Sequence, residues 1–333
     1  MSDAGNPRVA VIGTGEVGRG WAALLVSAGW PTAIFDTDAR TLDQGEQEIL
    51  RRVDALVAGG RATRAAADLG LGELRVGRSL LQAVGEAAWI IEALPEDLAL
   101  KQRTLEQIEQ VARMRAVITS STANLFASQL CGRLRNPSRL LVANPMVPVE
   151  LMPLVEVVPG PQTDAEAVES VRYWIRSLQR VPIMVNKEVP GHVVGRLTAA
   201  VWREAIQLVL DGVVDVATLD AAVQLGPGLA WTASGPHLTR AIGSGSNDIA
   251  RHIAERMVGF ETRWKDLAKW DQLGPEDQLR IGRAVEKAYT GRVPELRQQR
   301  DARLIQELAI ADEGPTGGWP GDLALVRPPE RAD

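Results

Sequence analysis

A glycine-rich turn lies between an apolar run and a helix-like segment near the start of the chain. Residues 8–13 read RVAVIG and are a strand candidate; TGEVG follows directly. G-x-G-x-x-G spacing is therefore formed by Gly13, Gly15 and Gly18. The first glycine permits a tight turn, the second lets the backbone approach a pyrophosphate, and the third allows close helix–strand packing. This arrangement predicts a dinucleotide-binding unit.

An acid at the end of the next strand candidate indicates which dinucleotide binds. Residues 32–36 read TAIFD, and Asp36 comes 18 residues after the last of the three glycines. A carboxylate there accepts hydrogen bonds from both ribose hydroxyls of NAD and repels the 2′-phosphate of NADP. We therefore predict NAD, held by the glycine turn, by Glu16 and Val17 at the helix start, and by Asp36. The nearby Arg40 is the one feature that would suit a 2′-phosphate instead.

Apolar runs continue to alternate with helix-like stretches as far as residue 185. They cover residues 89–93, 116–120, 139–144, 153–158 and 182–185. Such alternation is typical of a parallel, doubly wound α/β sheet. Thr163 and Glu166 have capping-box spacing at the start of one helix. Beyond residue 190 the strand patterns stop. We expect an NAD-binding domain over 1–188, an all-α domain over 189–313, and an irregular Gly- and Pro-rich tail over 314–333.

Composition excludes several classes of function. The net charge of −5 argues against a nucleic-acid partner, because phosphate binding needs clustered positive charge. Cys131 is the only cysteine and there are three histidines, which argues against a disulfide or a metal centre. The polar first eight residues do not resemble a signal peptide, and no uncharged apolar run of about 18 residues is present. We expect a cytoplasmic protein that binds no membrane.

Six further stretches stand out over residues 9–239: VAVIGTGEVGRGWAALLVSAGW, IIEALPEDLALK, ITSSTANL, NPMVPVELMPLVEVVP, KEVPGHVVGRL and GPGLAWTASGPHLT. Together they resemble the 3-hydroxyacyl-CoA dehydrogenase family, and especially its branch of L-gulonate 3-dehydrogenase (lambda-crystallin) and carnitine 3-dehydrogenase. The resemblance implies a Rossmann-type domain followed by a helical domain that carries the contacts of a homodimer, with the active site between the two. It also implies that Glu96 and Lys101 lie beside the cofactor, with Ser120 and Ser121 at a strand end nearby.

The catalytic positions of the family are only partly present. In the family a histidine is the general base for the substrate hydroxyl, and a glutamate twelve residues later orients it. Glu156 matches the glutamate, but Asn144 stands where the histidine is expected. Asparagine can only donate or accept hydrogen bonds. Three further polar positions of the family are Ala123, Val147 and Gly195 here.

Three interpretations follow. In the first, another group transfers the proton: Glu156, His237, or His192, which we expect on one helical face with Gly195. In the second, Asn144 polarises a carbonyl or imine while NADH delivers hydride and water supplies the proton. In the third, the protein binds NAD(H) without turnover, as a structural or regulatory module.

The resemblance favours a small substrate with a free carboxylate. An arginine can hold a carboxylate through two parallel hydrogen bonds, and Arg196 is placed by the resemblance near the substrate. Trp231 lies in the GPGLAW stretch, which the resemblance also places on the substrate side. We therefore predict Ser121, Arg196, Trp231 and His237 as substrate residues.

Overall fold

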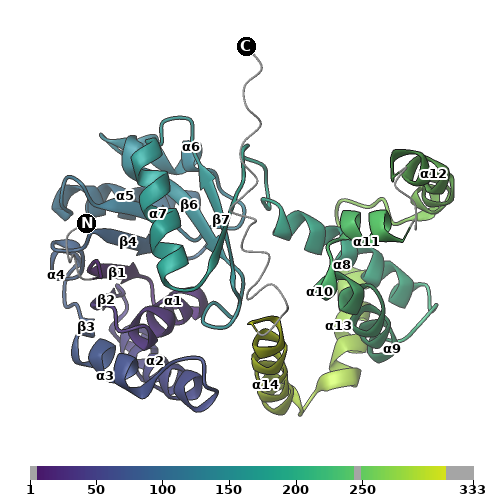
Figure 1. Cartoon of the computed structure of the whole chain (residues 1–333), viewed down its shortest axis with the longest axis horizontal. Helices are drawn as coiled ribbons and strands as arrows, with labels where there is room; N and C mark the ends of the chain where they lie inside the picture. Colours follow the sequence, from purple (N-terminus) through teal and green to yellow (C-terminus); the bar gives the residue numbers. More distant parts are fainter. Residues whose placement is uncertain (1–5, 244–248, 313–333) are drawn as a thin grey trace. The chain divides into compact units, whose positions relative to one another are not determined.

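The computed structural model describes residues 6–243 and 249–312. The chain forms two compact units: Met1–Gly195 together with Gln298–Asp333, and Arg196–Arg297 (Figure 1). The tail expected over 314–333 lies outside the described residues. Among the described residues, no helix combines the length and the apolar character needed to span a membrane.

The first unit is built on an eight-stranded sheet of order β3-β2-β1-β4-β5-β6-β7-β8. Its strands are β1 (Val9–Ile12), β2 (Thr32–Phe35), β3 (Arg75–Val76), β4 (Trp89–Glu92), β5 (Val117–Ser120), β6 (Leu140–Pro145), β7 (Leu154–Pro159) and β8 (Val181–Met184). The predicted doubly wound α/β sheet is confirmed. One pair, β6 with β7, is antiparallel, because the connection between them is too short for a parallel crossover. β3 was not predicted, since two residues give no readable periodicity.

The side chains of the central strands alternate between the two faces of the sheet and contribute to a hydrophobic core on each face. In β1, Val9 and Val11 enter one core and Ala10 and Ile12 the other. Figure 1 shows α7 lying across β6 and β7 on one face. The helices of this unit are α1 (Glu16–Ser27), α2 (Ala39–Ala58), α3 (Arg64–Gly72), α4 (Leu80–Val84), α5 (Leu98–Val111), α6 (Ala127–Leu130) and α7 (Ala165–Ser177).

The capping box expected at the start of α7 is absent. The N-cap is Asp164, and its side chain makes no capping hydrogen bond. The Thr163 hydroxyl instead donates to the Leu140 carbonyl at 2.6 Å and accepts from the Gly160 N–H at 2.9 Å. The threonine therefore ties the α7 entry to β6, a long-range contact that the local spacing could not reveal.

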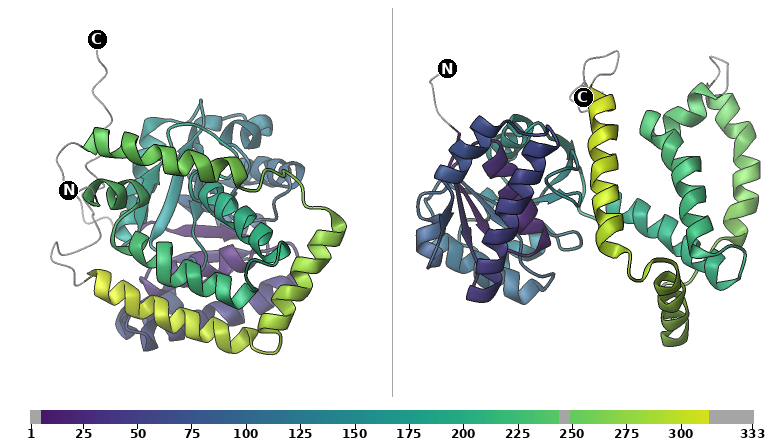
Figure 2. Two further views of the ribbon diagram at one scale, coloured as in Figure 1. Left: turned by 90° about the vertical axis from the view of Figure 1, so that its right-hand side faces the viewer. Right: turned by 90° about the horizontal axis from the view of Figure 1, so that it is seen from below.

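The described part of the second unit is helical (Figure 2). It contains α8 (Val194–Leu210, which begins in the first unit), α9 (Val216–Val223), α10 (Leu229–Ala233), α11 (Pro236–Ile242), α12 (Ile249–Asp266), α13 (Pro275–Tyr289) and the start of α14 (Val293–Asp312). Of its described apolar side chains, only those of Ile206 and Val216 are large and buried, whereas many others are exposed. From Gln298 onward α14 belongs to the first unit, where Ile305 approaches Gly59 closely.

Candidate cofactor and active site

The glycine turn has one open position and two closed ones. Gly13 has a φ of 95°, and a Cβ added there would lie 2.7 Å from the Ala93 carbonyl oxygen. A Cβ on Gly18 would lie 1.9 Å from the Gly13 oxygen. At Gly15, the exposed N-cap of α1, a Cβ would meet nothing within 4 Å. The turn thus packs tightly against the protein and leaves its helix N-terminus open, which fits a dinucleotide pyrophosphate.

The acid after β2 is tied to this turn. Asp36 Oδ2 accepts from the Thr14 N–H at 2.8 Å and from the Thr14 hydroxyl at 3.2 Å. Its Oδ1 accepts from the Asp38 N–H at 3.1 Å. The structure therefore brings the predicted ribose acid to the glycine turn. A carboxylate in this place suits the ribose hydroxyls of NAD.

Glu16, the first residue of α1, is held by an arginine that sequence reasoning did not identify. Arg52 of α2 contacts Glu16 at 2.8 Å and Glu150 at 3.1 Å. Burial alone would lower the pKa of Arg52, but Glu150 and Glu16 outweigh it and raise that pKa. Burial likewise raises the pKa of Glu150, against the lowering effect of Arg52. The neighbouring Val17 packs against the core.

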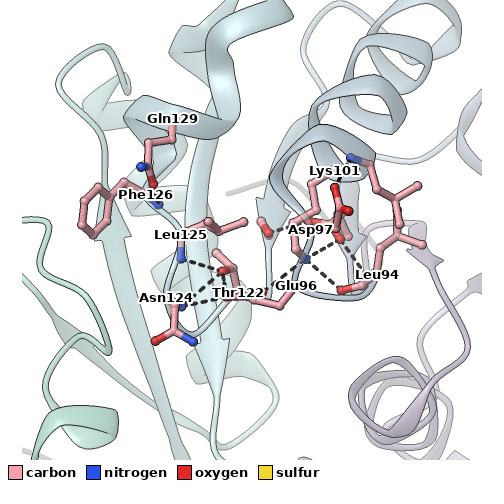
Figure 3. A network of polar contacts seen from close by, with 12 residues as sticks. Leu94, Glu96, Asp97, Lys101, Thr122, Asn124, Leu125, Phe126 and Gln129 are labelled. Carbon is pink, nitrogen blue, oxygen red and sulfur yellow. Dashed lines mark hydrogen bonds and ion pairs between the residues drawn. The ribbon is translucent and has the colours of Figure 1, made fainter. Parts of the chain in front are cut away.

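Glu96 lies in the connection between β4 and α5 and faces the connection after β5 (Figure 3). Its Oε1 accepts from the Thr122 hydroxyl at 2.5 Å and from the Asn124 N–H at 2.9 Å. The Glu96 side chain is 37% exposed. Of the two residues expected beside the cofactor in this stretch, Glu96 is therefore the one that reaches solvent.

Lys101, in contrast, is buried and paired with Glu92. The Lys101 Nζ donates to Glu92 Oε1 at 2.8 Å and to the Leu94 carbonyl at 2.9 Å. Ser120 donates its hydroxyl to Glu92 Oε2 at 2.5 Å, and Ser121 Oγ accepts from the Trp21 indole N–H at 3.1 Å. Sequence reasoning missed Glu92, although a carboxylate at the end of an apolar strand run was the available signal.

Asn144 and Glu156 face each other across the antiparallel pair. They are register partners in β6 and β7, and Asn144 Nδ2 donates to Glu156 Oε2 at 3.0 Å. The other oxygen, Glu156 Oε1, accepts from the N–H groups of Val193 and Val194 at 2.8 and 2.9 Å. The structure therefore brings the two predicted residues together. The buried Glu156 carboxylate also binds the start of α8.

His192 does not lie on the helical face with Gly195 that we expected. α8 begins at Val194, and His192 precedes it in a turn with a φ of 46°. The side chain is fully buried, and its Nε2 lies 3.1 Å from the Thr122 carbonyl oxygen. Because a carbonyl only accepts, Nε2 carries the hydrogen in this contact. Nδ1 is buried and has no hydrogen-bond partner among the described residues.

The other predicted substrate residues belong to the second unit. Arg196 is in the first turn of α8, Trp231 in α10 and His237 in α11, and all three are exposed. Among the described residues, no three His, Cys, Asp or Glu side chains are grouped so as to hold a metal ion.

The match to family models decides what kind of protein this is. Residues 8–189 match the NAD binding domain of 3-hydroxyacyl-CoA dehydrogenase, and residues 191–283 match its C-terminal domain. The chain belongs to the 3-hydroxyacyl-CoA dehydrogenase family. It is thus an NAD-dependent dehydrogenase of CH–OH donors, in agreement with the cofactor and the enzyme class that the sequence predicted.

Relatives and a solved structure cover nearly the whole chain. The L-carnitine dehydrogenase of Bacillus cereus is 34% identical over 315 residues, which are 94% of each chain. That of Pseudomonas aeruginosa is 34% identical over 300 residues, 90% of this chain and 88% of the relative. The crystal structure of 5-formyl-3-hydroxy-2-methylpyridine 4-carboxylic acid 5-dehydrogenase, an NAD+-dependent dismutase, has a TM-score of 0.77 at 25% identity, covering 93% and 99% of the two chains.

Proposed function

We propose that this dehydrogenase interconverts the hydroxyl and keto (or imine) group of a small 3-hydroxy-acid-like substrate, at a centre where Asn144 takes the place of the family's histidine. The observation that carries the proposal is the contact between Asn144 Nδ2 and Glu156 Oε2 at 3.0 Å. A carboxylate accepts hydrogen bonds and does not donate them, so this contact fixes the orientation of the Asn144 amide. The amide NH2 faces Glu156, and Oδ1 is left as an acceptor.

An acceptor at this position suits a substrate that carries a hydrogen there. A hydroxyl group can donate to Asn144 Oδ1, and so can the N–H of a protonated imine, whereas a bare ketone cannot. Bound NAD accepts the hydride in oxidation and NADH supplies it in reduction. In our proposal Asn144 orients the reacting oxygen or nitrogen. The hydroxyl proton leaves to water or to a second protein group.

Glu156 and His192 are the two first-unit groups proposed for that proton. Both Glu156 oxygens already accept hydrogen bonds, three in all, so this carboxylate is engaged in holding Asn144 and the start of α8. His192 Nδ1 has no hydrogen-bond partner among the described residues. We therefore favour His192 for proton transfer and Glu156 for holding Asn144. His192→Phe should then lower kcat while the Kd for NADH stays unchanged.

The substrate class rests on the relatives and on the predicted substrate residues. The relatives at 34% identity are L-carnitine dehydrogenases, and L-carnitine is a 3-hydroxy acid. We propose that Arg196 pairs with the substrate carboxylate, because its guanidinium is exposed and suited to a bidentate contact. Ser121, Trp231 and His237 are the further proposed substrate residues. We propose residues 1–188 as the NAD-binding domain and 189–313 as the substrate and dimerisation domain.

We further propose that the protein works as a homodimer in the cytoplasm. The second unit supports the dimer, since large apolar side chains such as Trp202, Leu225 and Leu229 are each more than 60% exposed. An exposed apolar area of this kind marks an interaction site. The single cysteine, present as a free thiol, is compatible with a reducing compartment.

A 340 nm assay with purified protein tests the function. L-carnitine, L-gulonate and 3-hydroxybutyrate are offered with NAD+, and the matching 3-keto compounds with NADH, from about pH 6 to 10. We expect turnover above about 0.1 s⁻¹ with at least one of them. Asn144→Ala should lose most of that activity, while the exposed-site control Asn6→Ala keeps it.

One observation favours a second candidate, an NAD(H)-binding protein without turnover. Glu156 is needed to bind the start of α8, so its presence does not require catalysis. Quenching of tryptophan fluorescence by NADH, without turnover of any of these compounds, would support this candidate and contradict the first.

A further inference from the structure

The helix that starts at the glycine turn begins with an acid. Glu16 is the first residue of α1, directly after the N-cap Gly15, and its side chain is 51% exposed. The first N–H groups of a helix have no partner within the helix, and a pyrophosphate binds to such groups. The Glu16 carboxylate belongs to the same residue as one of them, well within the about 10 Å over which charges interact at roughly 0.1 M salt. The backbone of Glu16 therefore attracts a pyrophosphate, whereas its side chain repels it.

The cation that contacts this carboxylate comes from the neighbouring helix α2. Arg52 Nη2 donates to Glu16 Oε2 at 2.8 Å. Arg19 is also a cation and lies on α1 itself, but it directs its Nε to the Thr14 carbonyl at 2.6 Å. The charge of Glu16 is thus offset by Arg52.

The offset is incomplete, because two further carboxylates share the same guanidinium. Arg52 Nη1 lies 3.1 Å from Glu150 Oε1, and Arg52 Nε lies 3.4 Å from Glu48 Oε1. Glu150 is packed against α1, since a Cβ on Gly20 would stand 2.8 Å from its Oε2. One positive charge therefore serves three carboxylates, and Glu16 is the most exposed of the three.

We infer that the Glu16 carboxylate lowers the affinity of the glycine turn for NAD, and that Arg52 determines by how much. This inference rests on the proposed placement of the NAD pyrophosphate at that turn. Arg52 is a positioning residue in it, because it holds and partly neutralises Glu16 without touching the cofactor. A weaker hold on NADH favours its release after oxidation, and product release limits the rate of many enzymes.

An acid in the first turn of a helix also has a structural role, because it interacts favourably with the helix dipole. The two roles predict different results for Glu16→Gln. If Glu16 only stabilises α1, the variant loses melting temperature and gains no affinity for NADH. If the carboxylate opposes the pyrophosphate, the variant binds NADH more tightly than the wild type.

The test is a double-mutant cycle of Glu16→Gln, Arg52→Met and the two combined, with the Kd for NADH and the melting temperature as readouts. We expect Glu16→Gln to tighten the Kd at least about threefold at about 20 mM salt and to lose most of that gain at about 500 mM salt. Arg52→Met leaves Glu16 unopposed and takes the guanidinium from the buried Glu150. Its Kd should weaken about tenfold and its melting temperature should fall. The combined variant should return to within about threefold of the wild-type Kd while its melting temperature stays low.

Glu166→Gln is the matched control, because it removes the same charge from the first turn of another helix, α7. The entry to α7 is tied to Leu140 at the start of β6, whereas the glycine turn follows the end of β1. Both strands run in the same direction, so the control lies at the opposite edge of the sheet. It should leave the Kd for NADH unchanged at both salt concentrations.

Each contrary result has a separate meaning. An unchanged or weaker Kd in Glu16→Gln would overturn the inference. A combined variant that binds NADH as weakly as Arg52→Met would also overturn it, because Arg52 would then act without Glu16. If Arg52→Met does not fold, Arg52→Lys takes its place; it keeps the charge, and a Kd more than about threefold weaker than that of the wild type would refute the electrostatic role. A Gly15→Ala protein that binds NADH like the wild type would instead contradict the proposed pyrophosphate site itself.

Discussion

Asn144→His should create the histidine–glutamate pair that this chain lacks. The Nδ2 atom of asparagine and the Nδ1 atom of histidine are both two bonds beyond Cβ. An imidazole at position 144 can therefore donate Nδ1–H to Glu156 Oε2, which now accepts from Asn144 at 3.0 Å. Asn144 is only half-buried, so the larger ring has room to extend toward solvent. Its Nε2 would then be unprotonated and able to accept the substrate proton.

The size of the gain follows from what a positioned base contributes. General acid–base catalysis is worth roughly 10²–10⁴ in rate, which corresponds to about 3–5 kcal/mol of activation free energy. We expect Asn144→His to raise kcat by about 10² or more for a hydroxy-acid substrate, and to add an acid limb to the pH–rate profile. The Kd for NADH should stay unchanged, because Asn144 is not among the proposed cofactor residues.

The assay is the initial rate at 340 nm over a pH series, with fluorescence titration of NADH alongside. Asn144→His combined with Glu156→Gln is the control. A neutral amide in place of the carboxylate holds and orients the imidazole less strongly, so at least about tenfold of the gain should disappear. A folded Asn144→His protein that binds NADH normally and gains less than about tenfold would refute the reasoning. Proton transfer at position 144 would then not limit the rate.

Three further predictions use other parts of the molecule. Gly15→Ala should weaken NADH binding at an unchanged melting temperature, whereas Gly13→Ala should lower both affinity and melting temperature, because only Gly13 has a positive φ and no space for a Cβ. A hydrogen bond to Asp220 at 2.5 Å raises the pKa of Tyr289 to about 12. The fold stabilises the neutral phenol, so the contribution of Tyr289 to folding stability is complete below about pH 10 and is lost as the pH rises through about 12. Absorbance titration at 295 nm in Tyr173→Phe, with and without Asp220→Asn, measures the pKa of Tyr289. Sedimentation equilibrium should give twice the 36.0 kDa chain mass.

The sequence predicted the sheet well because periodicity and the glycine turn are local signals. Seven of the eight strands of the described sheet coincide with the apolar runs, within one residue or so at their ends. The two-residue β3 carried no such signal, and the antiparallel β7 reads like any other buried strand. The capping box failed for a related reason, since Thr163 bonds to Leu140, which is distant in sequence, and to Gly160, which lies outside the helix.

The site was predicted in part, and its misses share a physical cause. Glu96, Asp36 and Asn144 lie in motifs, and spacing located them. Glu92 lies in the motif IIEALPEDLALK but received no role, and Arg52 lies in no motif. Their partners Lys101, Glu16 and Glu150 come from other elements, so these contacts are known only once the unit is assembled. The helical placement of His192 was wrong because α8 starts only at Val194, and His192 lies in the turn before it.

The contacts of the Asn144–Glu156 pair indicate that the fold constrains position 156 more strongly than position 144. A substitution at position 144 affects only one hydrogen bond of Glu156, the one accepted by Oε2. The asparagine present here supplies that hydrogen bond from its NH2 group. Replacing Glu156 would leave three donors without an acceptor, two of them backbone N–H groups at the start of α8. Buried donors that lose their acceptor cost about 1–3 kcal/mol each. The fold therefore constrains Glu156 whatever chemistry occurs, whereas only the chemistry constrains position 144. Activity in the Asn144 variants, and not the presence of Glu156, is what distinguishes an enzyme from a binding protein here.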